Sequence, residues 1–250
     1  MNLSEREKAM TLQLHQTAYM YRMQFARSGS ISYVGHLDLM RTFEHSLRRA
    51  GLPLLHSQGY NPRPMLVFAL PLGVGISSED DYLDVSLSED MRVEEVIEKL
   101  GKSLPDGLRI KDGWSVPETK GSIMAMITAA RYDLQAPCIY RAMEKLFVRD
   151  EINVEKRSKG QLRTLNIRPL MHELIREGSL FSGTDFEQKE DTASVLVCAG
   201  SHENVRPDLL LQALVLFENY PDKDASNCEV VRTGLYTGTY PDLKTLKEMM

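Results

Sequence analysis

The sequence predicts an α+β protein made of two tandem ferredoxin-like domains, each with the order βαββαβ and an antiparallel sheet. Two observations lead to this prediction. Strand-like and helix-like apolar patterns follow one another in that order over residues 18–117, and the order returns less cleanly over residues 129–240. Residues 118–128 join the two predicted domains. In this fold two helices cover one face of a four-stranded sheet.

The elements of the first domain are supported by their apolar spacing. The predicted order is strand 18–27, helix 34–50, strands 65–72 and 81–87, helix 93–104 and strand 108–116. In the first helix, Leu37, Met40, Phe43 and Leu47 recur at three and four residues, which predicts an amphipathic helix with one face on the core. The turn-forming sequence Pro-Asp-Gly at 105–107 separates the second helix from the last strand.

The second domain has the same kinds of element with less regular spacing. We expect strand 130–135, helix 138–148, a hairpin over 153–167 that turns at 158–160, strand 194–199, helix 207–218 and strand 228–235. Pro207 opens the last helix, where its missing N–H needs no partner.

Composition is that of an ordinary globular protein, with 42% apolar and 26% charged residues among 250. No apolar run approaches the roughly 20 residues of a membrane span, and residues 1–18 lack a signal-peptide core, so we expect a cytoplasmic protein with no membrane partner. Cys138, Cys198 and Cys228 are isolated, which predicts buried thiols rather than disulfides. No cysteine or acidic spacing indicates a metal site or a cofactor in this chain.

Charge is unevenly distributed along the chain, whose net charge is −5. Residues 22–63 contain six arginines and two acids, a local charge of +4, whereas residues 77–98 contain nine acids and one arginine, a local charge of −8. One surface could therefore bind an anion while another repels it. Alternatively, both segments are merely solvated faces of a helix and an edge.

Four sequence blocks resemble a known bacterial family. They are HLDLMR, LRRAGLP, SQGYNPRP and FALPLGVGISSEDDYLDV, in that order. Together they resemble the radical SAM-linked domain family, whose members occur alone or fused behind a radical S-adenosylmethionine enzyme and whose function is unassigned. The likeness is strongest over residues 21–116 and extends more thinly to about residue 236, with KRSKG and LNIRPL also fitting. It implies a radical SAM partner, and since a CxxxCxxC motif is missing from this chain, the cluster would belong to that partner.

The arginines of the first domain are candidate phosphate ligands. Arg41, Arg49 and Arg63 lack an acid at helical spacing, and guanidinium groups bind phosphate oxygens bidentately. Arg48 instead has Glu44 four residues before it, which predicts a weak surface ion pair.

The loop after the first predicted helix, HSQGYNPRP, is the other half of this candidate RNA site. Asn61 offers hydrogen bonds, and Tyr60 offers a ring on which a base can stack for roughly 1–3 kcal/mol. Two prolines stiffen the loop, which would reduce the entropy lost on binding. The alternative is a plain turn closed by Gly59 and Asn61, with Tyr60 packed inward.

The second domain adds Lys156, Arg157, Lys159, Arg163 and Arg168 in the predicted hairpin region. Cations on one face of a β-ribbon can follow a phosphate backbone. Lysine-rich hairpins also protect exposed sheet edges from aggregation, and the two interpretations are equally supported.

Three functions are consistent with these features. The first is an RNA-binding accessory protein of a radical SAM enzyme, acting in rRNA or tRNA modification or processing. The second is a metal-independent endoribonuclease with His36 as its acid or base and Arg41 on the scissile phosphate, since tandem ferredoxin-like domains resemble the CRISPR repeat-associated RNA-binding superfamily. The third is a docking module whose acidic residues 77–98 bind a basic partner. Gly234 and Gly238 are too sparse for the glycine-rich loop of that superfamily, and no catalytic constellation is evident, so binding is favoured over catalysis.

Overall fold

The computed structural model describes residues 18–117, 121–158, 160–177, 190–201 and 203–249. The first half has the elements β1 (Tyr19–Arg27), a 3-10 turn (Gly29–Tyr33), α2 (His36–Arg49), β2 (Leu66–Phe68), β3 (Ser77–Leu87), α3 (Val93–Gly101) and β4 (Leu108–Val116). All pairs among these strands are antiparallel, in the order β4-β1-β3-β2. The first half is therefore ferredoxin-like, as the sequence predicted.

A short helix, α4 (Ile123–Met126), precedes the second half. This half has β5 (Ala129–Pro137), α5 (Ile139–Phe147), β6 (Asn153–Ser158), β7 (Gln161–Asn166), a 3-10 turn (Arg168–Leu170), β8 (Met171–Glu177), β9 (Glu190–Cys198), α6 (Pro207–Glu218), α7 (Asp222–Ser226), β10 (Glu229–Thr237) and β11 (Lys244–Thr245). The order β10-β5-β9-β8 is again ferredoxin-like and antiparallel, with β6 and β7 forming a separate hairpin.

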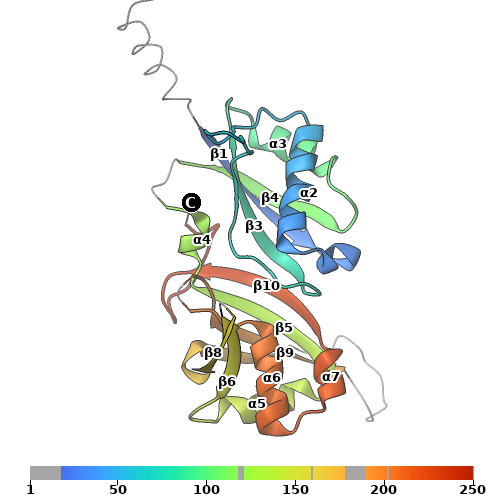
Figure 1. Ribbon diagram of the computed structural model, residues 1–250, viewed down its shortest axis with the longest axis vertical. Coiled ribbons are helices and arrows are strands. Elements are labelled where there is room, and N and C mark those ends of the chain that lie inside the picture. The colour runs from blue at the N-terminus through green and yellow to red at the C-terminus, as the bar shows by residue number, and fades with distance from the viewer. Residues whose placement is uncertain (1–17, 118–120, 159, 178–189, 202, 250) are drawn as a thin grey trace, which may run out of the picture.

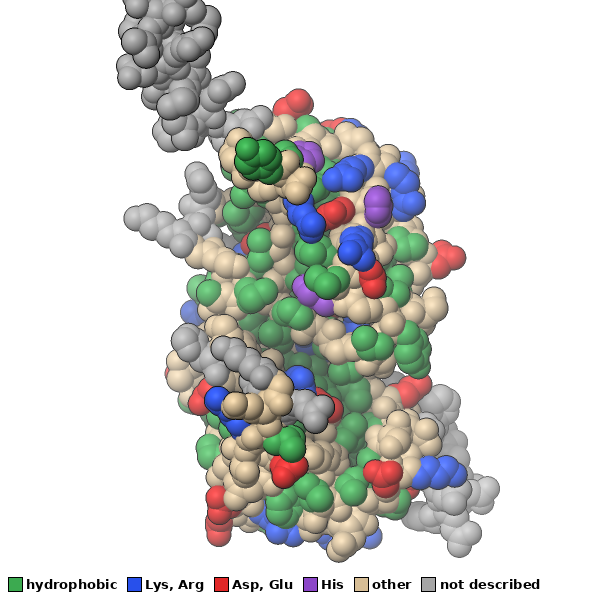
Figure 2. Space-filling model, viewed as in Figure 1, with side chains coloured by type: hydrophobic (Ala, Val, Ile, Leu, Met, Phe, Trp, Pro, Cys, Tyr) green, Lys and Arg blue, Asp and Glu red, His purple; other side chains and the backbone are tan. Residues whose placement is uncertain are grey.

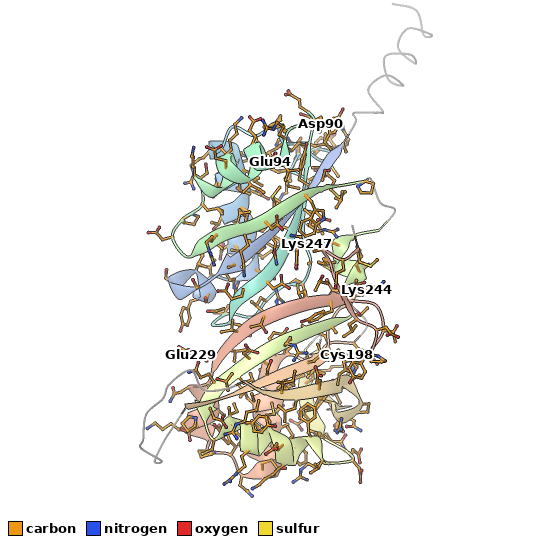
Figure 3. All side chains as sticks on the ribbon, turned by 180° about the vertical axis from the view of Figure 1, so that it is seen from behind. Asp90, Glu94, Cys198, Glu229, Lys244 and Lys247 are labelled. Atoms are coloured by element: carbon orange, nitrogen blue, oxygen red, sulfur yellow. The ribbon has the colours of Figure 1, made fainter. Side chains whose placement is uncertain are left out.

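The two halves share one nine-stranded sheet. Its order is β4-β1-β3-β10-β5-β9-β8, and a short parallel pair between β3 and β10 joins the halves. In Figure 1 α2 lies in front of the upper strands and α6 lies in front of the lower ones, and Figure 3 shows the strands from the opposite side. The fold class is thus α+β with antiparallel sheets, while the domain limits 18–117 and 129–240 stay a prediction.

Two strands differ from expectation. β2 has only three residues because the chain leaves the sheet after Phe68, and the carbonyl groups of Leu70, Gly73 and Ile76 accept hydrogen bonds from arginine side chains instead. The sequence predicts no strand at β8, which lies between the expected hairpin over 153–167 and the expected strand over 194–199. Its sequence, MHELIRE, does not alternate between apolar and polar residues, and its register against β9 shifts between Met171 and Glu173.

Three buried arginines are bonded inside the fold, and one of them joins the two halves. Arg232 of β10 is fully buried and forms an ion pair with Asp81 of β3. Arg27 of β1 is equally buried, and its Nη2 donates to the carbonyl of Gly73 at 2.7 Å. Arg22 forms a second buried pair with an aspartate of β3, with Nε 2.7 Å from an oxygen of Asp84.

Burial of these arginines and aspartates changes the charge expected on the two surfaces. Arg22 and Arg27 lie in the interior, so they add nothing to the exposed positive charge of residues 22–63. Asp80, Asp81 and Asp84 are buried rather than solvated. Asp80 accepts hydrogen bonds from the side chain of Gln24 and from a backbone amide of β10. The sequence could not indicate this, because the partners are 56 to 155 residues away along the chain.

The thiols are less buried than predicted. Cys138 is exposed, and Cys198 and Cys228 are half-buried. All three are free, as expected for isolated cysteines. No helix in the described part of the chain is long and apolar enough to cross a membrane.

Candidate nucleic-acid interface

Helix α2 presents one apolar and one charged face, as its spacing predicted. Leu39, Phe43 and Leu47 are buried against the sheet, while Arg41, Arg48 and Arg49 are exposed. Leu37 was expected on the core face, but it is 63% exposed, and Leu39 is buried instead. The helix therefore presents arginines along its length to solvent.

The chain after α2 forms a closed, projecting loop over residues 55–65, called here the Tyr60 loop. Its base is fixed to the last residues of β3, since the amide of Leu55 donates to the Ser86 carbonyl at 2.9 Å and the amide of Ser86 donates to Met65 at 3.0 Å. Within the loop, the amide of Ser57 donates to the Arg63 carbonyl at 2.8 Å. These contacts fix the two ends of the loop without burying its tip.

Residues 56–63 are exposed, whereas Pro64 is buried at the base. The relative solvent accessibility of Tyr60 is 106%, that of a fully exposed tyrosine, so its ring touches essentially nothing. The expectation that Tyr60 could pack inward is therefore wrong. Gly59 adopts φ +147°, a backbone conformation that side chains disfavour, which explains the glycine before the exposed ring.

Cationic and histidine side chains gather on this face. Figure 2 shows Lys, Arg and His side chains together over α2 and beside it, with acidic side chains interspersed. Besides the arginines, exposed His45 belongs to α2 and exposed His56 belongs to the Tyr60 loop. The overall charge of the patch is positive but not uniform.

The arginines differ in how far their hydrogen bonds are already satisfied. Arg41 Nη1 lies 2.8 Å from Asp38, three residues earlier, so the statement that Arg41 lacks an acid at helical spacing is wrong. Arg49 Nη2 donates to the Ser103 carbonyl at 2.6 Å. The guanidinium groups of Arg48 and Arg63 have no partner among the described residues, and the expected Arg48–Glu44 pair does not form there.

His36 is half-buried at the start of α2. Its ring stands edge-on to Phe68, with centroids 5.3 Å apart. Burial and the positive charge of Arg27 lower the pKa of His36, so the imidazole is neutral at pH 7. Within the described residues no acid, base or nucleophile is hydrogen-bonded to it. This environment suits a packed structural histidine better than a catalytic one.

The cations of the second half lie apart from this surface. Lys156 is half-buried in β6, and its Nζ donates to the Asn204 carbonyl at 3.3 Å. Lys159 and the side chain of Arg157 lie outside the described residues. In Figure 1 β6 belongs to the lower half and α2 to the upper half, so the structure does not bring Lys156 to the Tyr60 loop.

The sequence of this chain matches a bacterial protein family over most of its length. Its sequence model covers residues 20–207, that is, the whole first half and much of the second. The chain belongs to the family of uncharacterized proteins conserved in bacteria, DUF2344. The match includes α2, the Tyr60 loop and the buried ion pair of Arg22 with Asp84. Comparison with curated proteins gives no match.

Solved structures show only weak likeness. A CRISPR-associated protein, Cas6, is 8% identical at a TM-score of 0.22, covering 86% of this chain and 99% of its own. A RAMP protein described as binding different RNA substrates is 10% identical at 0.21, covering 74% and 89%. A DyP-type peroxidase from Streptomyces coelicolor is 11% identical at 0.23, covering 93% and 92%. Similarities at these scores carry no argument about function.

Sequence reasoning missed one group of reactive side chains. Cys198 of β9 lies beside His172 of β8, with Sγ 3.2 Å from Nε2. The two residues are 26 positions apart, and only the pairing of β8 with β9 brings them together. Because β8 was not predicted, no sequence signal could have placed this pair.

Proposed function

We propose that this protein binds RNA through the surface formed by the exposed face of α2 and the Tyr60 loop, and that it presents the RNA to a radical SAM enzyme. The observation that carries the proposal is the fully exposed ring of Tyr60 on a loop whose base is hydrogen-bonded to the sheet. A large aromatic side chain contributes to folding by burial, and Tyr60 buries nothing. Its ring is available to stack on a nucleotide base.

The arginines complete the interface. Arg48 and Arg63 have unpaired guanidinium groups in the described part of the chain, so phosphate binding would not require them to give up a protein partner. Arg41 and Arg49 are exposed as well, but phosphate would have to compete with Asp38 and with the Ser103 carbonyl. We therefore rank Arg63 and Arg48 above Arg41 and Arg49 as phosphate ligands.

Pre-organisation supports binding by the loop. The hydrogen bonds at its base and the buried Pro64 restrict the backbone before RNA arrives. Less conformational entropy is then lost on binding than for an unrestrained loop. Asn61, next to Tyr60 and equally exposed, offers donors and an acceptor for a base edge.

The radical SAM part of the proposal rests on sequence resemblance. The blocks HLDLMR and SQGYNPRP, which carry that resemblance, form the start of α2 and the Tyr60 loop, so the resemblance and the proposed interface coincide. The rRNA or tRNA substrate would be held here while the partner supplies the chemistry. Co-purification of this protein with the radical SAM enzyme, with and without ribonuclease, would test whether RNA joins the two proteins.

Fluorescence anisotropy with a labelled single-stranded RNA at several salt concentrations tests the interface. Tyr60→Ala should weaken binding by roughly 5- to 150-fold, the equivalent of one lost stacking contact. Arg63→Ala should weaken binding and reduce the slope of log affinity against log salt by about 0.7. Arg141→Ala, an exposed arginine of α5 in the other half, is the matched control and should change neither. Equal losses in Arg141→Ala would contradict the proposal.

The nuclease alternative is tested in the same preparation. If His36→Ala abolishes an EDTA-resistant cleavage that the unmodified protein shows on cellular RNA, the protein is an endoribonuclease. We expect no such cleavage and nearly unchanged RNA affinity for His36→Ala, because the ring packs on Phe68. The docking alternative keeps a smaller acidic surface: Asp80, Asp81 and Asp84 are buried, whereas the other six acids of residues 77–98 are exposed. A partner that binds equally well with and without ribonuclease would favour it.

A further inference from the structure

A second site lies in the other half of the molecule, at the end of the sheet where β9 finishes. There a pocket of about 320 Å³ is lined by His172 of β8, Cys198 of β9, and the segments that follow β9 and β10. Figure 3, seen from behind, labels Cys198 at one end of the strands of the second half. No residue of α2 or of the Tyr60 loop lines this pocket. It is therefore independent of the proposed RNA interface.

A thiol and an imidazole face each other in this pocket. The Sγ atom of Cys198 is 3.2 Å from Nε2 of His172, within hydrogen-bonding distance for a sulfur. The imidazole is held in place by Tyr240, whose ring stacks on it with centroids 4.6 Å apart and planes 6° apart. Orientation of the base by a third group is the usual arrangement around an activated nucleophile.

The charges around the pair favour its neutral form. Burial raises the pKa of Cys198, and the negative charge of nearby Glu203 raises it further. Burial lowers the pKa of His172, against an opposing effect of the Glu203 charge. At pH 7 the pair is therefore a thiol and a neutral imidazole. In the tautomer with its proton on Nδ1, Nε2 lies close enough to accept the thiol proton. Such a thiol needs its base in the reacting step, because little thiolate exists beforehand.

The backbone beside the thiol is shaped by a glycine. Gly200 has φ +142°, and a Cβ atom there would lie 2.3 Å from the carbonyl oxygen of Ile127, so no other residue fits. Gly200 and Ser201 line the pocket, and among the described residues no acceptor is bonded to their backbone N–H groups. Unpaired backbone N–H groups next to a nucleophile can stabilise an oxyanion.

We propose that Cys198 is a nucleophile, with His172 as its general base, for transfer of an acyl group from a small activated ester or thioester. Sγ forms a bond to the acyl carbon while the thiol proton moves to Nε2 of His172. The resulting oxyanion then collapses, and the bond to the leaving oxygen or sulfur breaks. The leaving group takes the proton from His172, so the products are an S-acyl cysteine and one free alcohol or thiol.

Metal binding is a less suitable role for the same residues. Across the described ranges no group of three or more His, Cys, Asp and Glu side chains is arranged to hold a metal ion. The pocket instead combines a nucleophile, an oriented base and unpaired amides, which are the three parts of an acyl-transfer site.

The test uses the whole protein and 4-nitrophenyl acetate as the acyl donor. Release of 4-nitrophenol is followed by absorbance, and the modified residue is identified by peptide mass spectrometry. We expect one acetyl group, on Cys198, and none on the Cys198→Ser variant. Cys138→Ser and Cys228→Ser are matched controls that should acetylate as the unmodified protein does. Acetylation of Cys138 in preference to Cys198 would overturn the proposal.

The role of His172 has its own measurement. His172→Gln should slow acetylation by about 100-fold or more at neutral pH, the usual contribution of a general base. The unmodified protein should show a rate that levels off once His172 is neutral, whereas the rate of the variant should keep rising with thiol ionisation. Among the described residues, Tyr240 and Glu203 are the titratable groups that contact or face the pair.

A folding defect is distinguished by thermal unfolding of each variant and by a second substitution, His172→Asn. If either variant folds normally and reacts at the unmodified rate with the same pH profile, His172 is not the base and the proposal fails. Loss of RNA binding has no bearing on this result, because Tyr60→Ala should acetylate normally.

Discussion

The two halves of the molecule lengthen at the same point of the βαββαβ order, between the first helix and the second strand, but in opposite ways. In the first half this insertion is the Tyr60 loop, whose residues 56–63 are exposed. In the second half it is the hairpin β6–β7, which contributes Val154 to the core with no exposed surface. Ile152 and Ile167, just before and after the hairpin, are also fully buried.

The comparison shows that the hairpin insertion stabilises the fold by burial and the Tyr60 loop does not. Each fully buried apolar side chain of the hairpin region contributes roughly 1.5–3 kcal/mol to folding. The tip of the Tyr60 loop contributes almost no burial, so its residues are free to serve binding. Substitutions in the two insertions should therefore separate stability from RNA affinity.

The largest effect is expected where the halves meet. Asp81→Asn leaves Arg232 as a fully buried cation without its partner, which should cost about 3–5 kcal/mol of unfolding free energy. Urea unfolding monitored by circular dichroism measures this. Glu79→Gln, an exposed acid two residues away on β3, is the control and should change stability little. A small effect of Asp81→Asn would mean that the halves do not depend on this pair.

The next effect concerns the buried insertion. Val154→Ala should lower the unfolding free energy by about 1.5–3 kcal/mol, because it removes apolar contacts from the core of the second half. Leu162 on the paired strand β7 is 61% exposed, and Leu162→Ala should change stability by less than about 0.5 kcal/mol. Equal effects of the two variants would contradict the view that β6 is part of the core.

The exposed insertion should behave in the opposite way. Tyr60→Ala should leave the unfolding free energy within about 0.5 kcal/mol of the unmodified protein, because the ring has no contacts to lose. The same variant should lose RNA affinity, as stated above. If Tyr60→Ala instead destabilises the protein as strongly as Val154→Ala, the loop is a structural element and the contrast between the halves disappears.

The smallest effect is a dependence on pH that both halves share. Burial lowers the pKa of His36 in the first half and of His172 in the second, so the folded protein binds protons less readily than the unfolded chain at these sites. This stabilisation is present above the ordinary histidine pKa of about 6.5 and is lost as the pH falls through the folded value. Unfolding free energies between pH 7 and 5 should fall less steeply in His36→Gln and His172→Gln.

Short-range sequence patterns determined much of the secondary structure of this protein. The spacing of Leu37, Met40, Phe43 and Leu47 predicted α2, and Phe43 and Leu47 do lie on its buried face, although Leu37 does not. The prolines of HSQGYNPRP predict a stiff loop. The order of elements in the first half followed from the same short-range patterns, because helix and strand periodicity is set by neighbouring residues. The fully exposed position of Tyr60 was one of two alternatives that these patterns left open.

Tertiary structure decided everything that depends on distant partners. Whether an arginine is a surface cation or a buried anchor was settled for Arg22 and Arg27 by strand β3 and the segment before it, about 50 residues or more away. The pairing of β8 with β9 likewise created the contact of Cys198 with His172. Strand pairing and charge burial are non-local, because one strand supplies only half of a ladder and one charge only half of an ion pair. A single stretch of sequence therefore cannot reveal them.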